Sequence, residues 1–332
     1  MVRFFHPTTT APCPLPSPST ACGRELTYRY AVSQVFSASL ILLPLYRILR
    51  LSSALMENLA LHIKTNVISS LVEDIKSGDL TAQLLPEDLI VNAQVITRQT
   101  GVLCGTQWFD ACFQALDASC TIAWHAKDGD SIRPGQTLCE ISGPVRILLT
   151  AERSALNLLQ TLSGTATTTR RYVDAVDGLK VKIMDTRKTL PGLRDAQKYA
   201  VRVGGGHNQR AGLYDGILIK ENHIAAAGSI SAVMAATFEL AQPGISVQIE
   251  VENMMELDEA LDAGAKLILL DNFDLEALRA AVEHTAGRAE LEASGGITLR
   301  GLREIAETGV DRISIGALTK DIEALDLSMR IN

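Results

Sequence analysis

From about residue 170 onward, short apolar runs alternate with amphipathic segments, and this alternation restricts the possible folds more than any other feature of the sequence. The apolar runs have the length and residue content of buried strands: VKIMD, ILIK, VQIEV, KLILLD, AELEAS and RISIG. Amphipathic segments such as DLEALRAAVEHTAG lie between several of them. Strand-to-strand spacings of about 20 to 35 residues fit right-handed strand-helix-strand units. The pattern predicts an α/β fold with a parallel sheet, closed as a barrel.

Polar and glycine residues stand where these predicted strands end. They comprise Asp185, Thr186, Arg187, Lys188, Lys220, Glu250, Asp271, Ser294, Gly295, Gly296 and Gly316. Because α/β barrels assemble their sites at the carboxyl ends of several strands, we expect these residues to face one another. The glycine-rich ends, SGG and IGA, belong to the last two strands, where barrels often bind a phosphate on backbone N–H groups.

The segment GGGHNQRAGLYDGILIKENH, residues 204–223, combines backbone freedom with positive charge. Glycines allow close approach or a sharp turn, and Arg210 and Lys220 are donor-only cations that suit carboxylates and phosphates. The dinucleotide-binding pattern fails because Gln209 stands where a glycine is needed, and the Gly-Lys-Ser/Thr of a phosphate loop is absent. The segment therefore predicts an anion site of another kind, with a surface loop as the alternative.

Residues before 170 follow a different plan. The stretch KTNVISSLVEDIK, residues 64–76, places Val67, Ile68, Leu71, Val72 and Ile75 on one face of a predicted helix. Alternating runs such as LIVNAQVITR and TIAWHAKDGDSIRPGQTLCEISG, with Gly and Pro between them, suit antiparallel strands. The pattern predicts a smaller α+β domain. Its DGDSIRPGQTLCEISG also resembles half of a lipoyl or biotinyl carrier domain, but no lysine hairpin follows.

Charge narrows the class of ligand. The formal net charge of -7 argues against a nucleic-acid-binding protein, which needs a basic surface to neutralise phosphates. Between Arg153 and Lys220, however, 12 Lys and Arg face 5 Asp and Glu. This cationic third of the chain would attract a small acidic substrate.

The N-terminal segment bears on the cellular compartment. Residues 35–49 resemble a signal-peptide core, yet the stretch is too short, and too interrupted by Pro44 and Arg47, to span a bilayer. We expect Met56 to be the working start and residues 1–55 to be a disordered or misassigned extension, with a cleaved signal peptide as the alternative. No C-x-x-C pair occurs, which predicts reduced cysteines and a cytoplasmic protein without a membrane partner. The cysteines are Cys13, Cys22, Cys104, Cys112, Cys120 and Cys139.

Several long motifs occur in a diagnostic order. They are EDIKSGDLT, ERSALNLLQTLSGTAT, TRKTLPGLRDAQKYAV, GGGHNQRAGLYDGILIKENH, IEVEN, LLDNF, ASGGI and ISIGALTK. Over about residues 60 to 332 the chain resembles the quinolinate phosphoribosyltransferase family. The resemblance implies an α+β lid domain (56–167 with the tail 317–332) and an open, TIM-like α/β barrel of fewer than eight strands (168–316). It also implies a homodimer, which could assemble further into a hexamer.

The resemblance further implies an activity in NAD biosynthesis. Quinolinate and phosphoribosyl pyrophosphate would give nicotinate mononucleotide, pyrophosphate and CO2, with Mg²⁺ as cofactor. By the family match, the residues that bind quinolinate are Arg153, contributed across the dimer interface, and Thr186, Arg187, Lys188, Gln209, Arg210 and Lys220. Those that bind phosphoribosyl pyrophosphate are Lys188, Glu250, Asp271, Asn272, Ser294, Gly295, Gly296 and Gly316. Lys188, Glu250 and Asp271 are the catalytic candidates, and Glu250 and Asp271 are the Mg²⁺ candidates.

One position departs from the family pattern, and other assignments stay open. The family usually carries His where this chain has Gln209, and an amide can donate a hydrogen bond but cannot carry charge. His207 is a possible substitute, and His223 either caps the turn after its strand or takes part in catalysis. Glu250 or Asp271 could instead cap a helix. The alternative functions are a paralogous barrel associated with molybdenum uptake and a non-catalytic regulatory barrel.

Overall fold

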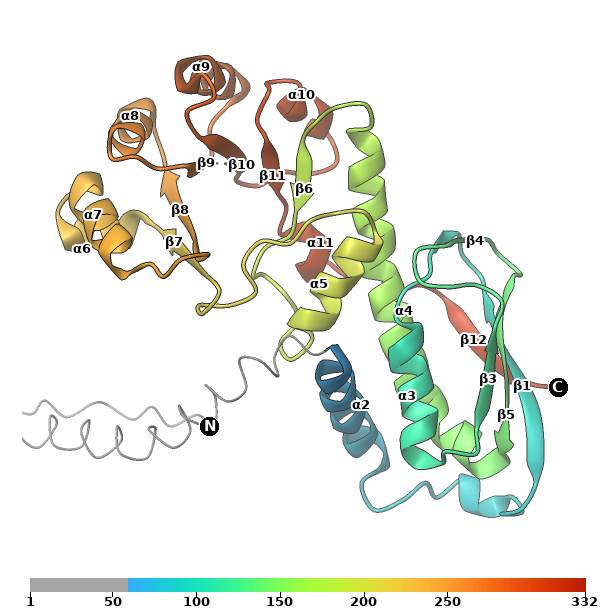
Figure 1. The fold of residues 1–332 in the computed structure, drawn as a ribbon. Coiled ribbons are helices and arrows are strands. Elements are labelled where there is room, and N and C mark those ends of the chain that lie inside the picture. Colours follow the sequence, from blue (N-terminus) through green and yellow to red (C-terminus); the bar gives the residue numbers. More distant parts are fainter. Residues whose placement is uncertain (1–58) are drawn as a thin grey trace, which may run out of the picture. The chain divides into compact units, whose positions relative to one another are not determined.

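A computed structural model describes residues 59–332 of the chain, and the predicted extension 1–55 lies outside the described residues. Residues Leu59–Asn332 form one compact unit. The unit contains an antiparallel sheet and a larger parallel sheet, each with its own hydrophobic core (Figure 1). This mixed architecture confirms the predicted fold class.

The antiparallel sheet has the strand order β12-β1-β5-β3. Its strands are β12 (Leu327–Ile331), β1 (Ile90–Thr97), β5 (Thr137–Pro144) and β3 (Thr121–Trp124). The same part of the chain contains a two-stranded sheet of β2 (Gly101–Val102) and β4 (Ser131–Ile132). It also contains the 3₁₀ helix η1 (Ala82–Leu84). Since β12 pairs with β1, with Met329 opposite Val95, the C-terminal strand belongs to the same sheet as strands from the first half of the chain.

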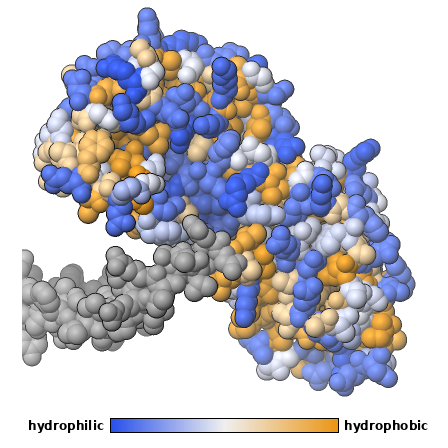
Figure 2. All heavy atoms as spheres, viewed as in Figure 1, coloured by the Kyte–Doolittle hydropathy of each residue, from blue (hydrophilic) through white to orange (hydrophobic). Residues whose placement is uncertain are grey.

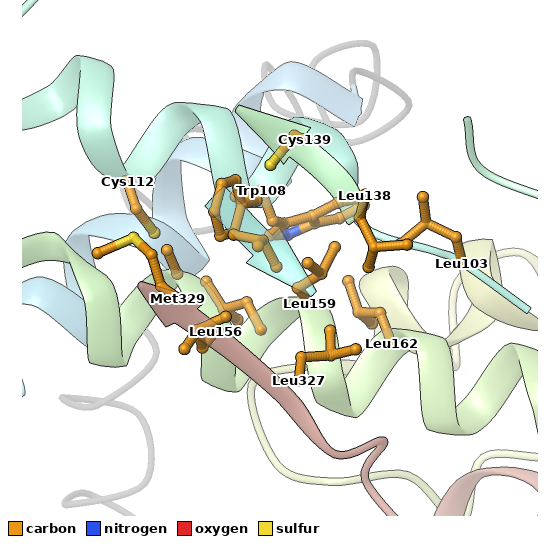
Figure 3. Packing of buried hydrophobic residues seen from close by; sticks show 14 of the residues in the cluster. Leu103, Trp108, Cys112, Leu138, Cys139, Leu156, Leu159, Leu162, Leu327 and Met329 are labelled. Carbon is orange, nitrogen blue, oxygen red and sulfur yellow. The ribbon is translucent and has the colours of Figure 1, made fainter. Parts of the chain in front are cut away.

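Three helices share one hydrophobic core with this sheet: α2 (Leu59–Ile75), α3 (Thr106–Leu116) and α4 (Val145–Ala175). Trp108, Leu156 and Leu159 are at most 1% exposed in the shared core, which Figure 3 shows from close by. Helix α4 runs through the predicted domain boundary at 167/168, so the predicted domain limits stay a prediction. The expected buried face of α2 was partly wrong, because Ile68 and Val72 are 46% and 63% exposed.

The parallel sheet contains all six predicted strands. Its order is β6-β11-β10-β9-β8-β7, and every neighbouring pair is parallel. The strands are β6 (Lys182–Met184), β11 (Arg312–Ser314), β10 (Glu290–Ser294), β9 (Leu267–Asp271), β8 (Ser246–Val251) and β7 (Gly216–Ile219). The edge strands β6 and β7 do not pair with each other, so the barrel is open between them.

Helices on the outer side of the parallel sheet are α6 (Glu221–Ala227), α7 (Ile230–Leu240), α8 (Met254–Asp262), α9 (Leu275–Thr285) and α10 (Leu302–Ala306) (Figure 1). Helix α5 (Arg194–Val203) packs against α2 and α4, and α11 (Ala317–Lys320) packs against α4. The side chains of Asn253 and Asp274 cap α8 and α9 by accepting backbone N–H groups. Glu250 and Asp271 are therefore not the caps of these helices, and their carboxylates remain available at the strand ends.

Among the described residues, no single helix is long and apolar enough to cross a membrane. Helices α6 and α7 pass this test only together, by length and composition, and they are bent by 96° where they meet.

The cysteines in the described range are packing residues. Cys104, Cys112, Cys120 and Cys139 are buried free thiols. Burial raises the pKa of Cys112 to about 12, so its thiol is protonated near neutral pH and is a poor nucleophile.

Candidate active site

The polar strand ends of the parallel sheet surround one pocket of about 170 Å³. It is lined by Thr186, Arg187, Lys188, Gln209, Arg210, Leu218, Lys220, Glu250, Leu269, Glu292, Ser294 and Ser314. Figure 2 shows hydrophilic residues gathered in the hollow of the barrel. The structure thus brings together most of the residues predicted from the sequence, and adds Glu292 and Ser314.

Two guanidinium groups stand at the open side of the barrel. Arg187 follows β6 and Arg210 precedes β7, and both are partly buried. Nη1 of Arg210 donates to the carbonyl of Gly216 at 3.1 Å. Burial and the charge of Arg187 lower the pKa of Arg210. Nε of Arg187 is buried and has no hydrogen-bond partner among the described residues. Two partly buried cations with an unused donor suit an anionic ligand.

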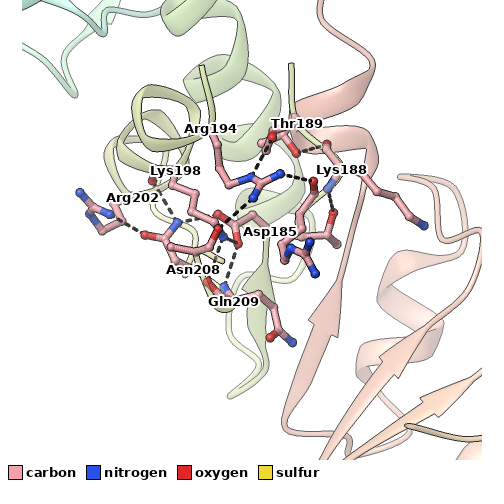
Figure 4. Close-up of polar contacts among 12 residues, drawn as sticks. Asp185, Lys188, Thr189, Arg194, Lys198, Arg202, Asn208 and Gln209 are labelled. Atoms are coloured by element: carbon pink, nitrogen blue, oxygen red, sulfur yellow. Dashed lines mark hydrogen bonds and ion pairs between the residues drawn. The ribbon is translucent and has the colours of Figure 1, made fainter. Parts of the chain in front are cut away.

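A buried ion pair fixes the segments that carry these arginines. Oδ1 of Asp185 accepts hydrogen bonds from Nζ of Lys198 at 2.6 Å and from the backbone N–H of Gln209 at 2.7 Å. Oδ2 of the same carboxylate accepts from Nδ2 of Asn208 at 2.6 Å (Figure 4). Burial raises the pKa of Asp185, and burial lowers the pKa of Lys198. Asp185 therefore connects the end of β6 to the segment before β7.

Arg194, at the start of α5, supports the same two segments. Its guanidinium donates to Oγ1 of Thr189 at 3.1 Å, to the carbonyl of Ala211 at 3.1 Å and to the carbonyl of Arg187 at 3.3 Å. Sequence reasoning did not select Lys198 or Arg194. The available signal was a lysine among the buried residues of an amphipathic helix, which requires a buried partner.

The glycine run 204–206 packs against α4. The carbonyl of Gly204 accepts a hydrogen bond from Nε of Arg170 at 2.9 Å. A Cβ at Gly204 would lie 2.6 Å from the carbonyl oxygen of Ala166. The glycines of this motif thus permit close approach of a loop to a helix, while Gln209 and Arg210 of the same motif line the pocket.

Lys220 and Glu250, from the neighbouring strands β7 and β8, form a close ion pair in the pocket. Nζ of Lys220 is 2.8 Å from Oε1 and 2.6 Å from Oε2 of Glu250. Nδ1 of His223 accepts the backbone N–H of Lys220 at 3.0 Å, and His223 does not line the pocket. His223 therefore stabilises the first turn of α6 by accepting the N–H of the N-cap residue Lys220. His207 is exposed, and its backbone bridges to Met184.

The ends of β9, β10 and β11 supply the predicted phosphate-binding residues. The backbone N–H of Asn272, which has φ +59°, donates to the carbonyl of Ser294 at 3.0 Å. A Cβ at Gly295, which has φ +108°, would lie 2.2 Å from Oδ1 of Asn272, so only glycine fits there. Within residues 59–332, the backbone N–H groups of Gly295, Gly296 and Gly316 donate no hydrogen bond. These three donors are available to a ligand.

Lys188 lies beside this group of residues. Its backbone N–H donates to Oγ1 of Thr186 at 3.0 Å, and its side chain is exposed. A Cβ at Gly316 would lie 3.0 Å from Cδ of Lys188. The lysine stem thus passes close to the end of β11, next to the arginine segment.

Six predicted site residues do not line the pocket: Asp271, Asn272, Gly295, Gly296 and Gly316 lie at the ends of β9, β10 and β11, and the sixth is Arg153. It lies in the N-terminal half of α4, is exposed, and does not line the pocket. Among the described residues its side chain has no hydrogen-bond partner. Burial raises the pKa of the neighbouring Glu152, and the charge of Arg153 opposes that rise.

Comparison with known proteins identifies two family models that match the chain in order. Residues 79–163 match the quinolinate phosphoribosyl transferase N-terminal domain, and residues 165–330 match the C-terminal domain of the same family. A probable nicotinate-nucleotide pyrophosphorylase [carboxylating] from Bacillus subtilis is 43% identical over 260 residues, covering 78% of this chain and 90% of the relative.

Two further relatives agree. A nicotinate-nucleotide pyrophosphorylase [carboxylating] from Mycobacterium leprae is 42% identical over 270 residues, covering 78% of this chain and 94% of the relative. The solved structure of the nicotinate-nucleotide pyrophosphorylase from Francisella tularensis superposes with a TM-score of 0.79 at 45% identity. That superposition covers 81% of this chain and 96% of the other.

Proposed function

The chain belongs to the quinolinate phosphoribosyltransferase family, and on this premise we propose that it joins quinolinate to phosphoribosyl pyrophosphate. The products are nicotinate mononucleotide, pyrophosphate and CO2, in NAD biosynthesis. One observation carries the proposal: Arg187 and Arg210 line the same pocket, and Nε of Arg187 is buried without a partner among the described residues. A substrate with two adjacent carboxylates matches two guanidinium groups, each of which can bind a carboxylate through two hydrogen bonds.

The cationic side chains divide into two kinds. Arg187 and Arg210 bind the quinolinate carboxylates directly. Lys220 forms an ion pair with Glu250, so it attracts the substrate carboxylates less strongly than an unpaired lysine would. Gln209 lines the pocket as well, and its backbone N–H is held by Asp185.

The other substrate suits the far strand ends. The free N–H groups of Gly295, Gly296 and Gly316 bind the 5-phosphate of phosphoribosyl pyrophosphate, as backbone amides do in other phosphate sites. At the end of β9, the carboxylate of Asp271 accepts hydrogen bonds from the ribose hydroxyls, and the side-chain amide of Asn272 donates to them. Lys188 stands between the two substrates and neutralises the pyrophosphate as it leaves.

The reaction needs alignment and charge neutralisation more than a nucleophilic side chain. The lone pair of the quinolinate nitrogen forms the bond to C1 of the ribose while the bond from C1 to the pyrophosphate oxygen breaks. The pyrophosphate takes that electron pair. The ring nitrogen, now positively charged, stabilises the electron pair left on C2 when CO2 departs, and C2 then takes up a proton. Fixed cations and amides around the pocket favour the separated charges.

The residues present fit a Mg²⁺ ion that is held largely by the substrate. Among the described residues no three His, Cys, Asp or Glu side chains cluster as a metal site, and Glu250 is paired with Lys220. Mg²⁺ commonly binds through one or two carboxylates plus substrate phosphates, and Asp271 with Glu250 supplies such a pair. When bound, the ion would neutralise the leaving pyrophosphate.

Arg153 completes the site from a second copy of the chain. This proposal is supported by its exposed position on α4, outside its own pocket, and by its lack of a hydrogen-bond partner in the described range. The working unit is then a homodimer with shared sites, which could assemble further into hexamers.

We also propose that the protein is cytoplasmic, and its buried free thiols support this location. The overall acidity supports small-molecule substrates over nucleic acid.

Calorimetric titration with quinolinate and with nicotinate tests the substrate assignment. Quinolinate should bind, and nicotinate, which lacks the second carboxylate, should bind about tenfold more weakly or worse. Equal affinity for the two acids would show that the arginine pair does not recognise a dicarboxylate. Failure of both acids to bind would remove the proposed function.

A further inference from the structure

Three polar side chains form a closed triangle of hydrogen bonds in the pocket. Nε2 of Gln209 donates to Oε1 of Glu292 and, at 3.3 Å, to Oε1 of Gln248. Nε2 of Gln248 donates to Oε2 of Glu292 at 3.0 Å. Gln248 and Glu292 are 3% and 0% exposed, and they come from β8 and β10, the two strands on either side of β9, which are called the middle strands below. Gln209 and Glu292 line the pocket.

The triangle fixes which end of the Gln209 amide is free. An amide nitrogen has two hydrogens, and both of those on Gln209 are used within the triangle. The reversed amide would place its oxygen against a carboxylate oxygen of Glu292, so the carboxylate determines the orientation. The carbonyl oxygen of Gln209, which is an acceptor, is therefore the group left for a ligand.

The pocket thus has two chemically different sides. The cationic groups of Arg187 and Arg210 come from segments next to the edge strands β6 and β7, and Lys220 on the same side is paired with Glu250. The middle strands supply Gln248 and the buried carboxylate of Glu292. Both oxygens of Glu292 accept N–H donors, which is the hydrogen-bonding pattern of an ionised carboxylate. An anion placed toward the middle strands would meet a negative charge and an acceptor oxygen.

We propose that Glu292, acting through Gln209, is a specificity-determining residue that admits carboxylates only on the arginine side of the pocket. The inference rests on the proposed function. Quinolinate carries its carboxylates at neighbouring ring positions, so both can face the arginines while the C–H edge of the ring faces the triangle. Isomers with separated carboxylates must turn one of them toward Glu292, and like charges in a desolvated site exclude such ligands strongly.

Replacement of Glu292 by glutamine tests the idea with little change in shape. Three amides can form a closed ring in which each donates to the next: Gln209 to residue 292, residue 292 to Gln248, and Gln248 to Gln209. The oxygen of Gln209 then lies inside the ring, and one of its N–H groups turns to the pocket. The substitution removes the charge and replaces an acceptor with a donor that suits a carboxylate.

The experiment measures binding of quinolinate and of pyridine-2,4-, 2,5- and 2,6-dicarboxylate by calorimetry at mildly alkaline pH, which favours the ionised form of Glu292. In Glu292→Gln, the ratio of isomer affinity to quinolinate affinity should rise about tenfold or more for at least one isomer. Glu290→Gln is the matched control, because Glu290 lies on the same strand, is exposed, and pairs with Arg312 outside the pocket. Its affinity ratios should equal those of the wild type.

A second variant guards against a folding defect. Gln248→Met keeps the charge of Glu292 but removes one of the two acceptors that hold the Gln209 amide, so discrimination should fall in the same direction by a smaller factor. The inference would be overturned if Glu292→Gln and Gln248→Met, where folded, kept the affinity ratios of the wild type. It would also be overturned if Glu290→Gln changed these ratios as much as Glu292→Gln does. Failure of the wild type to bind quinolinate would instead contradict the proposed function.

Discussion

Nζ of Lys198 lies 2.6 Å from Oδ1 of Asp185, and both side chains are at most 4% exposed. Asp185 directly precedes the Thr186-Arg187 segment and also accepts the backbone N–H of Gln209, the residue before Arg210. One buried ion pair therefore positions both guanidinium groups of the pocket. Because the carboxylate has three donors, its charge is compensated even though burial raises its pKa.

Breaking this ion pair should destabilise the protein and disturb the site. We expect Lys198→Met to lower the free energy of unfolding by about 3 to 5 kcal/mol, because it leaves the buried charge of Asp185 without its cation. Urea-induced unfolding measures the change. Arg98→Ala is the control: it removes an exposed pair with Asp326 and should change the free energy by less than about 1 kcal/mol. A Lys198→Met value as small as that of the control would show that the pair does not stabilise the fold.

Removal of either pocket guanidinium should weaken binding without unfolding the chain. Charge-assisted hydrogen bonds contribute about 1.5 to 3 kcal/mol each, so Arg187→Ala or Arg210→Ala should weaken quinolinate binding by about tenfold or more. The melting temperature should barely change, because Nε of Arg187 has no partner to lose in the described structure and Arg210 loses one hydrogen bond, to the carbonyl of Gly216. Arg171→Ala, on the exposed side of α4, is the control and should bind normally. If the variants unfold but their folded fraction binds quinolinate normally, the two arginines stabilise the fold and do not bind the substrate.

The strands were predictable because a buried parallel strand has a local signature. Runs such as KLILLD and RISIG became β9 and β11 within a residue or two of the expected limits. Ile68 and Val72 lie on the predicted apolar face of α2 but are exposed. The apolar pattern of a helix does not show how much of that face the neighbouring elements cover. The strand pattern predicted a closed barrel, which was wrong, and the family resemblance implied an open one; the position of the opening, between β6 and β7, is shown by the structure.

Around the pocket, too, some residues could be predicted from the sequence and others could not. Arg187, Arg210 and Lys220 were found because they stand at strand ends or in a recognisable motif. Lys198 and Arg194 were missed because their roles depend on contacts with other segments. Gln248 and Glu292 were hidden inside strand runs, although a polar residue at a buried strand position is a signal that it has a polar partner.

The stability of the protein should depend on pH through Glu292. Burial raises the pKa of this carboxyl above its ordinary value of 4.5, against hydrogen bonds that include one from Gln248. The folded state then binds the proton more tightly than the unfolded state. Its contribution to stability is fully present below 4.5 and is lost as the pH rises through the raised pKa.

Urea unfolding of the wild type and of Glu292→Gln from about pH 4 to about pH 8 measures this linkage. The free energy of unfolding of the wild type, minus that of the variant, should decrease as the pH rises through this range. The same difference for Glu290→Gln should not show that decrease. A difference that increases with pH would mean that hydrogen bonding outweighs burial and lowers the pKa of Glu292.

Hybrid dimers test whether Arg153 acts across an interface. Homodimers of Arg153→Ala and of Arg187→Ala should each be nearly inactive. When they are dissociated and mixed equally, about half of the dimers become hybrids, in which one site carries both lesions and the other carries none. Activity should return to about a quarter of the wild-type value. If mass measurement shows hybrids but no activity returns, Arg153 serves the site of its own chain.

The reaction itself tests the central claim most directly. Purified protein is incubated with quinolinate, phosphoribosyl pyrophosphate and Mg²⁺, and nicotinate mononucleotide, pyrophosphate and CO2 are quantified, with nicotinate in place of quinolinate as the parallel reaction. We predict that the three products form in equal amounts from quinolinate and that nicotinate gives none of them. Product from nicotinate but not from quinolinate, or no product from either acid with folded protein, would contradict the account.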